Sequence, residues 1–130
     1  MAAGRAGFTL LEAVVALTIV SLAGVAALST VGAELRSAAR AQEYLEAAAL
    51  AEDRLAVLEF LSDRELDLLP DSIEKGRFPG MLEGFEWSSG ARRVPGEDGL
   101  FDVHVTIQWT HGSHHVASRV YRPPRAGVLP

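Results

Sequence analysis

The chain has 130 residues, which fits about one domain, and it contains no cysteine, so a disulfide framework, a zinc-finger spacing and a thiol nucleophile are excluded. Its net charge of −5 argues against nucleic acid as a partner, because a nucleic-acid-binding protein needs a basic face. Apolar residues make up 48% of the chain and are concentrated in its N-terminal third, whereas the remainder has the composition of a soluble domain.

The N-terminal third contains a long apolar segment. From Ala13 to Ala33 the chain runs for 21 residues without a charge. At 1.5 Å per residue, a helix of this length covers ~30 Å, the thickness of the hydrocarbon core of a bilayer. Arg5 is the only charge before Glu12, so the positive-inside rule places the N-terminus in the cytoplasm and the bulk of the chain across the membrane. The pattern predicts a transmembrane helix over residues 8–33.

Glu12 does not fit a plain membrane anchor. A carboxylate at the centre of a membrane helix costs about 2.5–3.5 kcal/mol, so a chain that carries one has usually given it a partner. A single-span anchor with a periplasmic binding module explains the length of the segment but not the glutamate. A secretory signal peptide cut after the small residues at 21–23 or 25–27 is the other alternative. The apolar run continues past both positions, and Glu12 interrupts the start of the apolar region.

The stretch Ala6-Gly7-Phe8-Thr9-Leu10-Leu11-Glu12 resembles the class III signal of type IV pilins and type II secretion pseudopilins. The resemblance implies that a prepilin peptidase cuts between Gly7 and Phe8, removes residues 1–7 as a leader peptide and leaves Phe8 with an N-methylated amine. It also implies that Glu12 is the assembly glutamate, which meets the amine of a neighbouring subunit. Four residues make one helical turn, so amine and carboxylate lie near the same face. Their pairing offsets two costly membrane charges and sets the axial register.

Residues 34–69 are predicted to continue the helix into the domain. No proline or glycine occurs from Glu34 to Leu61, and good helix formers dominate. The recurrence of apolar residues every three or four positions predicts one buried face, formed by Ala41, Tyr44, Ala48, Ala51, Leu55 and Leu58. We expect this face to pack on the sheet of the same domain, and its small residues also suit packing against neighbouring helices. The helix is expected to end between Leu61 and Leu69, before Pro70.

Residues 70–122 are predicted to form a loop-rich segment and an antiparallel sheet in the periplasm, followed by a tail over residues 123–130. Residues 101–109 alternate apolar and polar without interruption, which is typical of a half-buried strand. Residues 85–94 are expected to form the preceding strand, residues 111–114 a turn, and residues 116–121 the returning strand. The predicted fold is α+β: a long N-terminal helix, with a membrane half and a domain half, packed on a small antiparallel sheet as in pilins.

Several charged and polar residues lie close enough in the sequence to suggest a metal site. The histidines His104, His111, His114 and His115 cluster near one turn, but His114 and His115 are adjacent and would point to opposite faces of a strand, so we expect no metal site. Glu97, Asp98 and Asp102 lack the spacing of a calcium loop.

A catalytic or cofactor site is not expected. The chain shows no Ser/His/Asp constellation and no glycine-rich phosphate loop, so it predicts no enzymatic activity and no cofactor. The arginines Arg92, Arg93, Arg119, Arg122 and Arg125 are expected to be solvated surface charges, the alternative being a patch that meets acidic subunits.

Three further segments resemble the minor pseudopilins of the I type: Leu50–Leu58, Gly84–Trp87 and Val103–Val105. The resemblance implies a single-pass inner-membrane protein at the tip of the type II secretion pseudopilus, where it helps to nucleate the filament for protein export. The implied partners are minor pseudopilins of the J and K types, the major pseudopilin, the prepilin peptidase and the inner-membrane assembly platform. A minor pilin of the V type, which primes a type IV pilus, is the alternative within the same superfamily.

Overall fold

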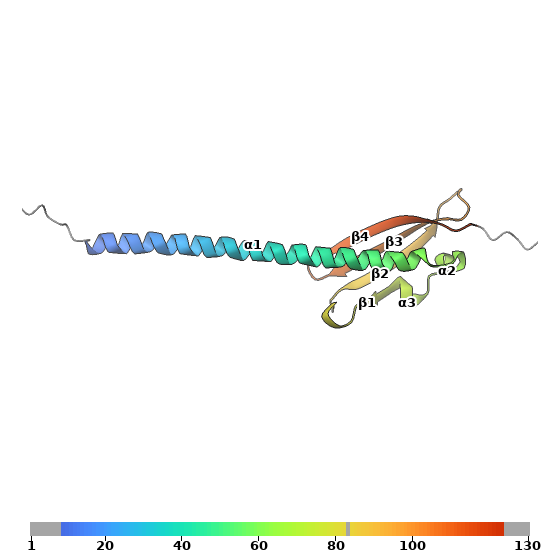
Figure 1. Ribbon diagram of the computed structural model, residues 1–130, viewed down its shortest axis with the longest axis horizontal. Helices are drawn as coiled ribbons and strands as arrows, with labels where there is room; N and C mark the ends of the chain where they lie inside the picture. Colours follow the sequence, from blue (N-terminus) through green and yellow to red (C-terminus); the bar gives the residue numbers. More distant parts are fainter. Residues whose placement is uncertain (1–8, 83, 124–130) are drawn as a thin grey trace, which may run out of the picture. The chain divides into compact units, whose positions relative to one another are not determined.

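The computed structural model describes residues 9–82 and 84–123. The elements follow in the order α1 (Leu10–Glu59), α2 (Asp63–Asp67), α3 (Asp71–Glu74), β1 (Lys75–Arg77), the 3₁₀ helix η1 (Gly80–Leu82), β2 (Glu86–Arg93), β3 (Leu100–Trp109) and β4 (Gly112–Tyr121) (Figure 1). The chain divides into two compact units, residues 1–40 and residues 41–130. In the second unit, helix α1 packs on a four-stranded antiparallel sheet, which confirms the predicted α+β, pilin-like fold class.

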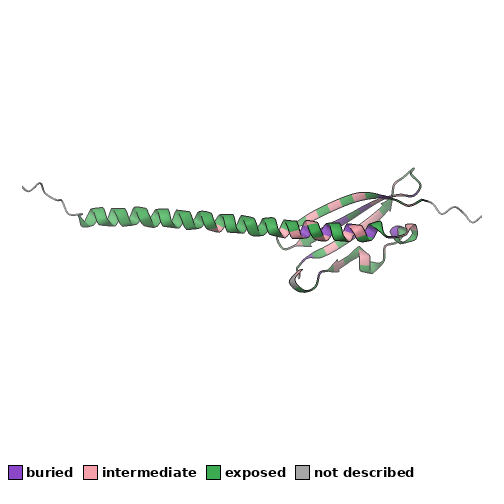
Figure 2. Ribbon diagram, in the orientation of Figure 1, coloured by how far each residue is buried: buried purple, intermediate pink, exposed green. Residues whose placement is uncertain are grey.

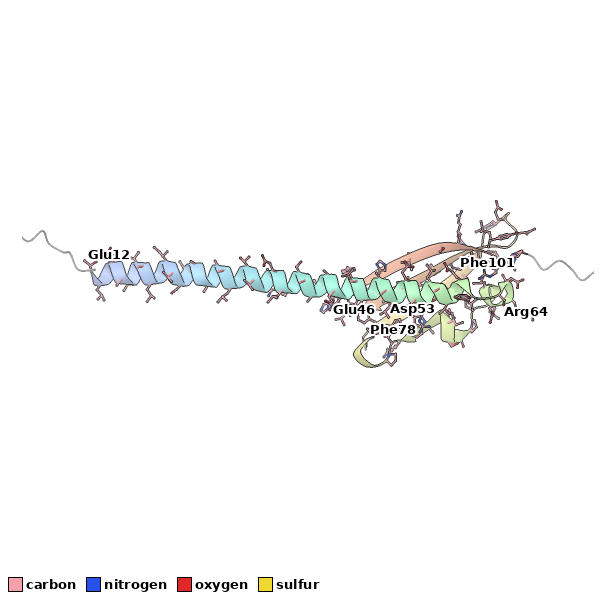
Figure 3. The ribbon with its side chains drawn as sticks, viewed as in Figure 1. Glu12, Glu46, Asp53, Arg64, Phe78 and Phe101 are labelled. Atoms are coloured by element: carbon pink, nitrogen blue, oxygen red, sulfur yellow. The ribbon has the colours of Figure 1, made fainter. Side chains whose placement is uncertain are left out.

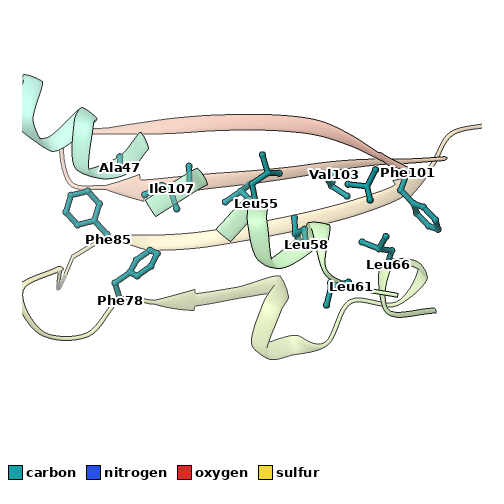
Figure 4. Close-up of a cluster of buried hydrophobic side chains, with 13 residues drawn as sticks. Ala47, Leu55, Leu58, Leu61, Leu66, Phe78, Phe85, Phe101, Val103 and Ile107 are labelled. Atoms are coloured by element: carbon teal, nitrogen blue, oxygen red, sulfur yellow. The ribbon is translucent and has the colours of Figure 1, made fainter. Parts of the chain in front are cut away.

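The buried face of α1 is formed by Ala47, Ala51, Leu55 and Leu58. The predicted stripe is therefore correct in its second half and wrong in its first half, because Ala47 is buried in place of Ala48, and Tyr44 is 48% exposed. Residues 47–49 and 51 are all alanine, so apolar side chains lie on several faces of the helix and the sequence pattern does not select one. The core of the domain forms where this face meets the sheet (Figure 4).

Helix α1 ends at Glu59, not between Leu61 and Leu69 as the sequence predicted. Ser62 has an extended backbone and starts the separate helix α2: its hydroxyl accepts a hydrogen bond from the Glu65 N–H, and the Glu65 carboxylate accepts one from the Ser62 N–H at 2.9 Å. This reciprocal pair is a capping box, which satisfies N–H groups that the first turn leaves free. The pKa of Glu65 is lowered by the hydrogen bond that its carboxylate accepts from the Ser62 backbone and, to a smaller extent, by the one from the Ser62 hydroxyl.

Arg122 closes the C-terminal end of α1. Its guanidinium donates hydrogen bonds to the Leu61 carbonyl at 2.8 Å and to the Glu59 carbonyl. The last carbonyls of a helix lack partners within the helix, and a cation placed there also interacts favourably with the helix dipole. The residue that follows β4 therefore satisfies carbonyls at and just beyond the end of α1.

The sheet has the strand order β1-β2-β3-β4, and every pair is antiparallel. The alternation predicted for β3 is confirmed in the burial of Phe101, Val103, Val105 and Ile107. Two details differ from the prediction. Strand β1 has three residues, too few to show a periodic pattern. The turn before β4 occupies residues 110–111, so His114 lies in the strand and not in the turn.

Candidate functional site

The first turn of α1 fixes the position of Glu12. Thr9 precedes the helix; its side-chain oxygen accepts a hydrogen bond from the Glu12 N–H at 3.1 Å, and its carbonyl accepts one from the Ala13 N–H at 3.0 Å. Threonine is a favoured cap, and an acidic residue in the first turn suits the positive end of the helix dipole. Thr9 and Glu12 therefore both stabilise the start of the helix. Figure 3 shows Glu12 at this end of α1.

The surface around Glu12 is apolar on all sides. Leu10, Leu11 and the large apolar residues as far as Leu35 are about half exposed or more (Figure 2). The hydroxyls of Thr18 and Thr30 donate to the carbonyls four residues earlier, at 2.8 and 3.0 Å, so these two polar groups are satisfied within the helix. By length and composition this helix can cross a membrane.

Glu12 differs from those threonines in its partners. It is exposed, and its carboxylate makes no hydrogen bond or ion pair with residues 9–82 or 84–123. Such a carboxylate on an apolar helix is an acceptor for a cationic group that the described residues do not supply. The predicted cleavage and methylation residues, Gly7 and Phe8, lie outside the described residues.

The histidines are dispersed over the hairpin. The rings of His104 and His115 lie 5.7 Å apart, and His115 Nδ1 is hydrogen-bonded to the Thr106 hydroxyl at 2.9 Å. His111 Nδ1 lies 3.3 Å from the carboxylate of Glu43, which also accepts a hydrogen bond from the Trp109 indole. Among the residues that the structure describes, no group of three or more histidine, cysteine or acidic side chains is placed to hold a metal ion.

The arginines, expected to be solvated surface charges with one shared patch as the alternative, lie at several separate places on the domain. Arg92 and Arg119 lie beside Asp102, with Arg119 Nε 2.8 Å and Arg92 Nη2 3.9 Å from its carboxylate. Arg93 binds Asp67 instead, with Nε 2.6 Å from Oδ1. This hydrogen bond lowers the pKa of Asp67. Arg122 caps α1, as described above, and Arg125 lies outside the described part of the chain.

The sequence did not predict the contacts of Trp87. The Arg54 guanidinium of α1 lies 3.5 Å from the centroid of the Trp87 ring, and Phe78 lies 4.7 Å from it. Gly76 of β1 pairs with Trp87, and a side chain at that position would overlap the indole. A glycine inside a strand often marks such a close approach, but the sequence did not show that Gly76 lies in a strand, because β1 has three residues only.

Residues 3–28 match the prokaryotic N-terminal methylation motif, a match that includes Gly7, Phe8 and Glu12. This motif indicates a type IV pilin-like or pseudopilin protein, a structural and not an enzymatic class. It implies processing by a prepilin peptidase and assembly into filaments with other pilins. The motif and the apolar helix are together consistent with single-pass membrane anchoring. Comparisons with curated proteins and with solved structures gave no match.

Proposed function

We propose that the protein is a minor pseudopilin of a type II secretion system, similar to the I type, which helps to nucleate the pseudopilus for protein export. One observation carries the proposal: Glu12 lies in the first turn of a long apolar helix, inside the matched methylation motif. The helix-on-sheet domain that follows has the architecture expected of such a subunit.

In this proposal, the prepilin peptidase cuts between Gly7 and Phe8 and the amine of Phe8 is methylated. The new amine then lies four residues before Glu12 in the sequence and two residues before the start of α1 at Leu10. Glu12 of one subunit accepts a hydrogen bond from the amine of the next, and each charge offsets the cost of placing the other in the membrane. Lateral packing of the helices draws subunits partly out of the bilayer and starts the filament.

The contacts within the domain support the assignment to the I type. Arg54 belongs to the first segment that resembles this type, Leu50–Leu58, and Trp87 ends the second, Gly84–Trp87. The two side chains stack at 3.5 Å. The third segment supplies Val103 and Val105, both fully buried in the same core as Leu55 and Leu58. All three segments therefore contribute to one packing unit.

The first experiment is a mass measurement of the N-terminal peptide of the full chain, taken from membranes with and without a prepilin peptidase. We expect a peptide that begins at methylated Phe8 only where the peptidase is present. Gly7→Leu should remain uncut, whereas Glu52→Gln, a change on the exposed surface of the same helix, should be processed like the wild type. An intact Met1 or a cut near Ala27 in the presence of the peptidase would contradict the proposal.

A second experiment separates the secretion system from the pilus. The gene is deleted in the native host, and both protein release into the medium and surface pili are measured. We expect loss of protein release, restored by the wild type and by Glu52→Gln but not by Glu12→Gln. Loss of surface pili with protein release intact would instead identify a minor pilin.

A further inference from the structure

The two edges of the sheet are very different. Strand β1 forms one edge with three residues, whereas β4 forms the other with ten. Strand β4 contains no proline or lysine, and its register with β3 is unbroken from Leu100–Tyr121 to Trp109–Gly112, so no bulge turns the edge away. No described strand pairs with its outer side (Figure 1). Proteins normally shorten, charge or cover such an edge, because its free backbone groups can pair with another chain.

The hydrogen-bond phase shows which groups are free. The Arg122 N–H donates to the Gly99 carbonyl at 2.7 Å, so these residues form a hydrogen-bonded pair just beyond the register of β3 and β4. Because such pairs alternate with non-bonded ones in an antiparallel ladder, every second residue of β4 turns its N–H and C=O outward. These residues are Ser113, His115, Ala117, Arg119 and Tyr121.

The inner face of β4 is incompletely buried. Four apolar residues of β3 on that face are buried, but on β4 Val120 alone is, while Gly112, His114, Val116 and Ser118 are half-buried. An apolar side chain from an added strand would lie next to Val116 and extend the core. Cross-strand neighbours of this kind are the unit of sheet stabilisation.

The face of the sheet opposite the buried one carries an excess of positive charge near β4. Arg119 and Arg92 share the single carboxylate of Asp102, and β4 itself contains no acidic residue. An open recess of about 500 Å³ lies beside this group, and its lining includes Asp102 itself together with His104, His115 and Arg119. An acidic side chain from a neighbouring strand would fit this recess and compensate the second guanidinium.

We propose that the free edge of β4 binds an extended segment of a partner protein as a fifth strand. The segment places apolar side chains beside Val116 and an acidic side chain beside Arg119. Main-chain hydrogen bonds to the outward residues of β4 supply the affinity, and the two side-chain positions supply the selectivity. This proposal stands independently of the secretion role, since it rests on β4, on its pairing with β3 and on the neighbouring Arg92 of β2.

The test uses the full chain, labelled with ¹⁵N, in detergent micelles. The probe is a ten-residue synthetic peptide that alternates valine with threonine and carries one central glutamate; a second peptide has lysine in place of the glutamate. We expect the glutamate peptide to slow amide exchange at residues 113, 115, 117 and 119, and to bind at least tenfold more tightly than the lysine peptide.

Two proline variants block the edge without removing a bond to β3, because the N–H at each position points outward. Ala117→Pro and Ser113→Pro should each weaken binding at least tenfold, whereas the matched changes Ala117→Val and Ser113→Thr should leave it within about twofold. The amide shifts of β2 report that each variant is folded. Binding that survives both proline changes overturns the proposal, as does protection on another surface. Concentration-dependent protection without peptide also overturns it, because the occupant is then a second copy of this chain.

Discussion

Replacing Gly76 by alanine should destabilise the domain, because Trp87 occupies the space of the new side chain. A Cβ at position 76 would lie 2.3 Å from Cζ2 of the indole, where ordinary contact begins at 3.4 Å, so the ring would have to move by about 1 Å. The ring has little freedom to do so: it lies between β1 and the Arg54 guanidinium, with Phe78 beside it. Its indole N–H is buried without a hydrogen-bond partner among the described residues, so packing and the stacked guanidinium hold the ring in place.

The expected loss follows from two opposing terms. Overpacking of a well-filled site costs about 1–3 kcal/mol. Replacing a glycine in a strand by alanine returns about 0.5–1 kcal/mol through the lower entropy of the unfolded chain. These two terms leave a net destabilisation by Gly76→Ala of about 0–2.5 kcal/mol, centred near 1 kcal/mol. Each kcal/mol lowers the melting temperature of a domain of this size by about 4–8 °C.

Gly90→Ala is the matched control. A Cβ at Gly90 would lie 2.2 Å from the ring of His104 if that ring stayed in place, which is as close as the contact between a Cβ at Gly76 and Trp87. His104 is exposed, however, so its ring can swing into solvent. Urea unfolding of the full chain in micelles, followed by tryptophan fluorescence, should therefore show no loss of stability for Gly90→Ala and a gain of up to about 1 kcal/mol, because the gain from replacing a strand glycine applies here as well. Equal losses for the two variants would refute the explanation, as would a stabilised Gly76→Ala.

Three further changes test other parts of the molecule. Glu12→Gln should still be cut by the prepilin peptidase but should not form filaments, as measured by pelleting of sheared fibres. Ser62→Ala removes the hydroxyl that caps α2, which should cost about 1 kcal/mol in urea unfolding. Asp67→Asn should lower stability at neutral pH, because Arg93 lowers the pKa of Asp67 in the folded state. The benefit of the wild-type carboxylate is complete above its ordinary pKa of 3.8 and is lost as the pH falls through the lower, folded-state value.

Each of these changes has an outcome that contradicts its reasoning. Filaments formed by Glu12→Gln at wild-type yield would show that the carboxylate does not set the register. A Ser62→Ala variant as stable as Ser62→Thr, which keeps a capping hydroxyl, would show that the cap contributes nothing. An Asp67→Asn loss that persists undiminished in acid would assign the effect to packing and not to charge.

The parts of the fold that the sequence predicted are those in which one face is buried and the pattern is long. Strand β3 alternates from Phe101 to Trp109, so its inner face could be assigned residue by residue. Strand β1 spans three residues and offered no pattern. The end of α1 was misplaced because no glycine or proline marks it. The Ser62-to-Glu65 spacing was the available signal, since it is typical of a capping box.

The candidate site divides in the same way. Glu12 was found because a carboxylate in an apolar run conflicts with its surroundings, and that conflict is visible in the sequence alone. The stacking of Arg54 on Trp87 joins residues far apart in the chain, and no periodicity encodes it. Which acid each arginine of β2 pairs with depends on the face of the strand from which its side chain projects. Arg92 and Arg93 are neighbours in sequence but pair with different acids, because successive side chains of a strand point to opposite faces.

The two proposed contacts contribute different things to an assembly. The pairing of Glu12 with a methylated amine sets axial register, but any subunit with the same signal can supply that amine, so it cannot select a partner. The apolar surface around Glu12 selects little either, because dispersion contacts between apolar helices are not directional. The edge of β4 fixes which backbone groups a partner strand must present, and it requires an apolar side chain beside Val116 and an acidic one beside Arg119. This combination can discriminate between partner proteins. Loss of Glu12 should therefore abolish every assembly, whereas blocking Ala117 should change which partner is recruited and leave processing and membrane insertion intact.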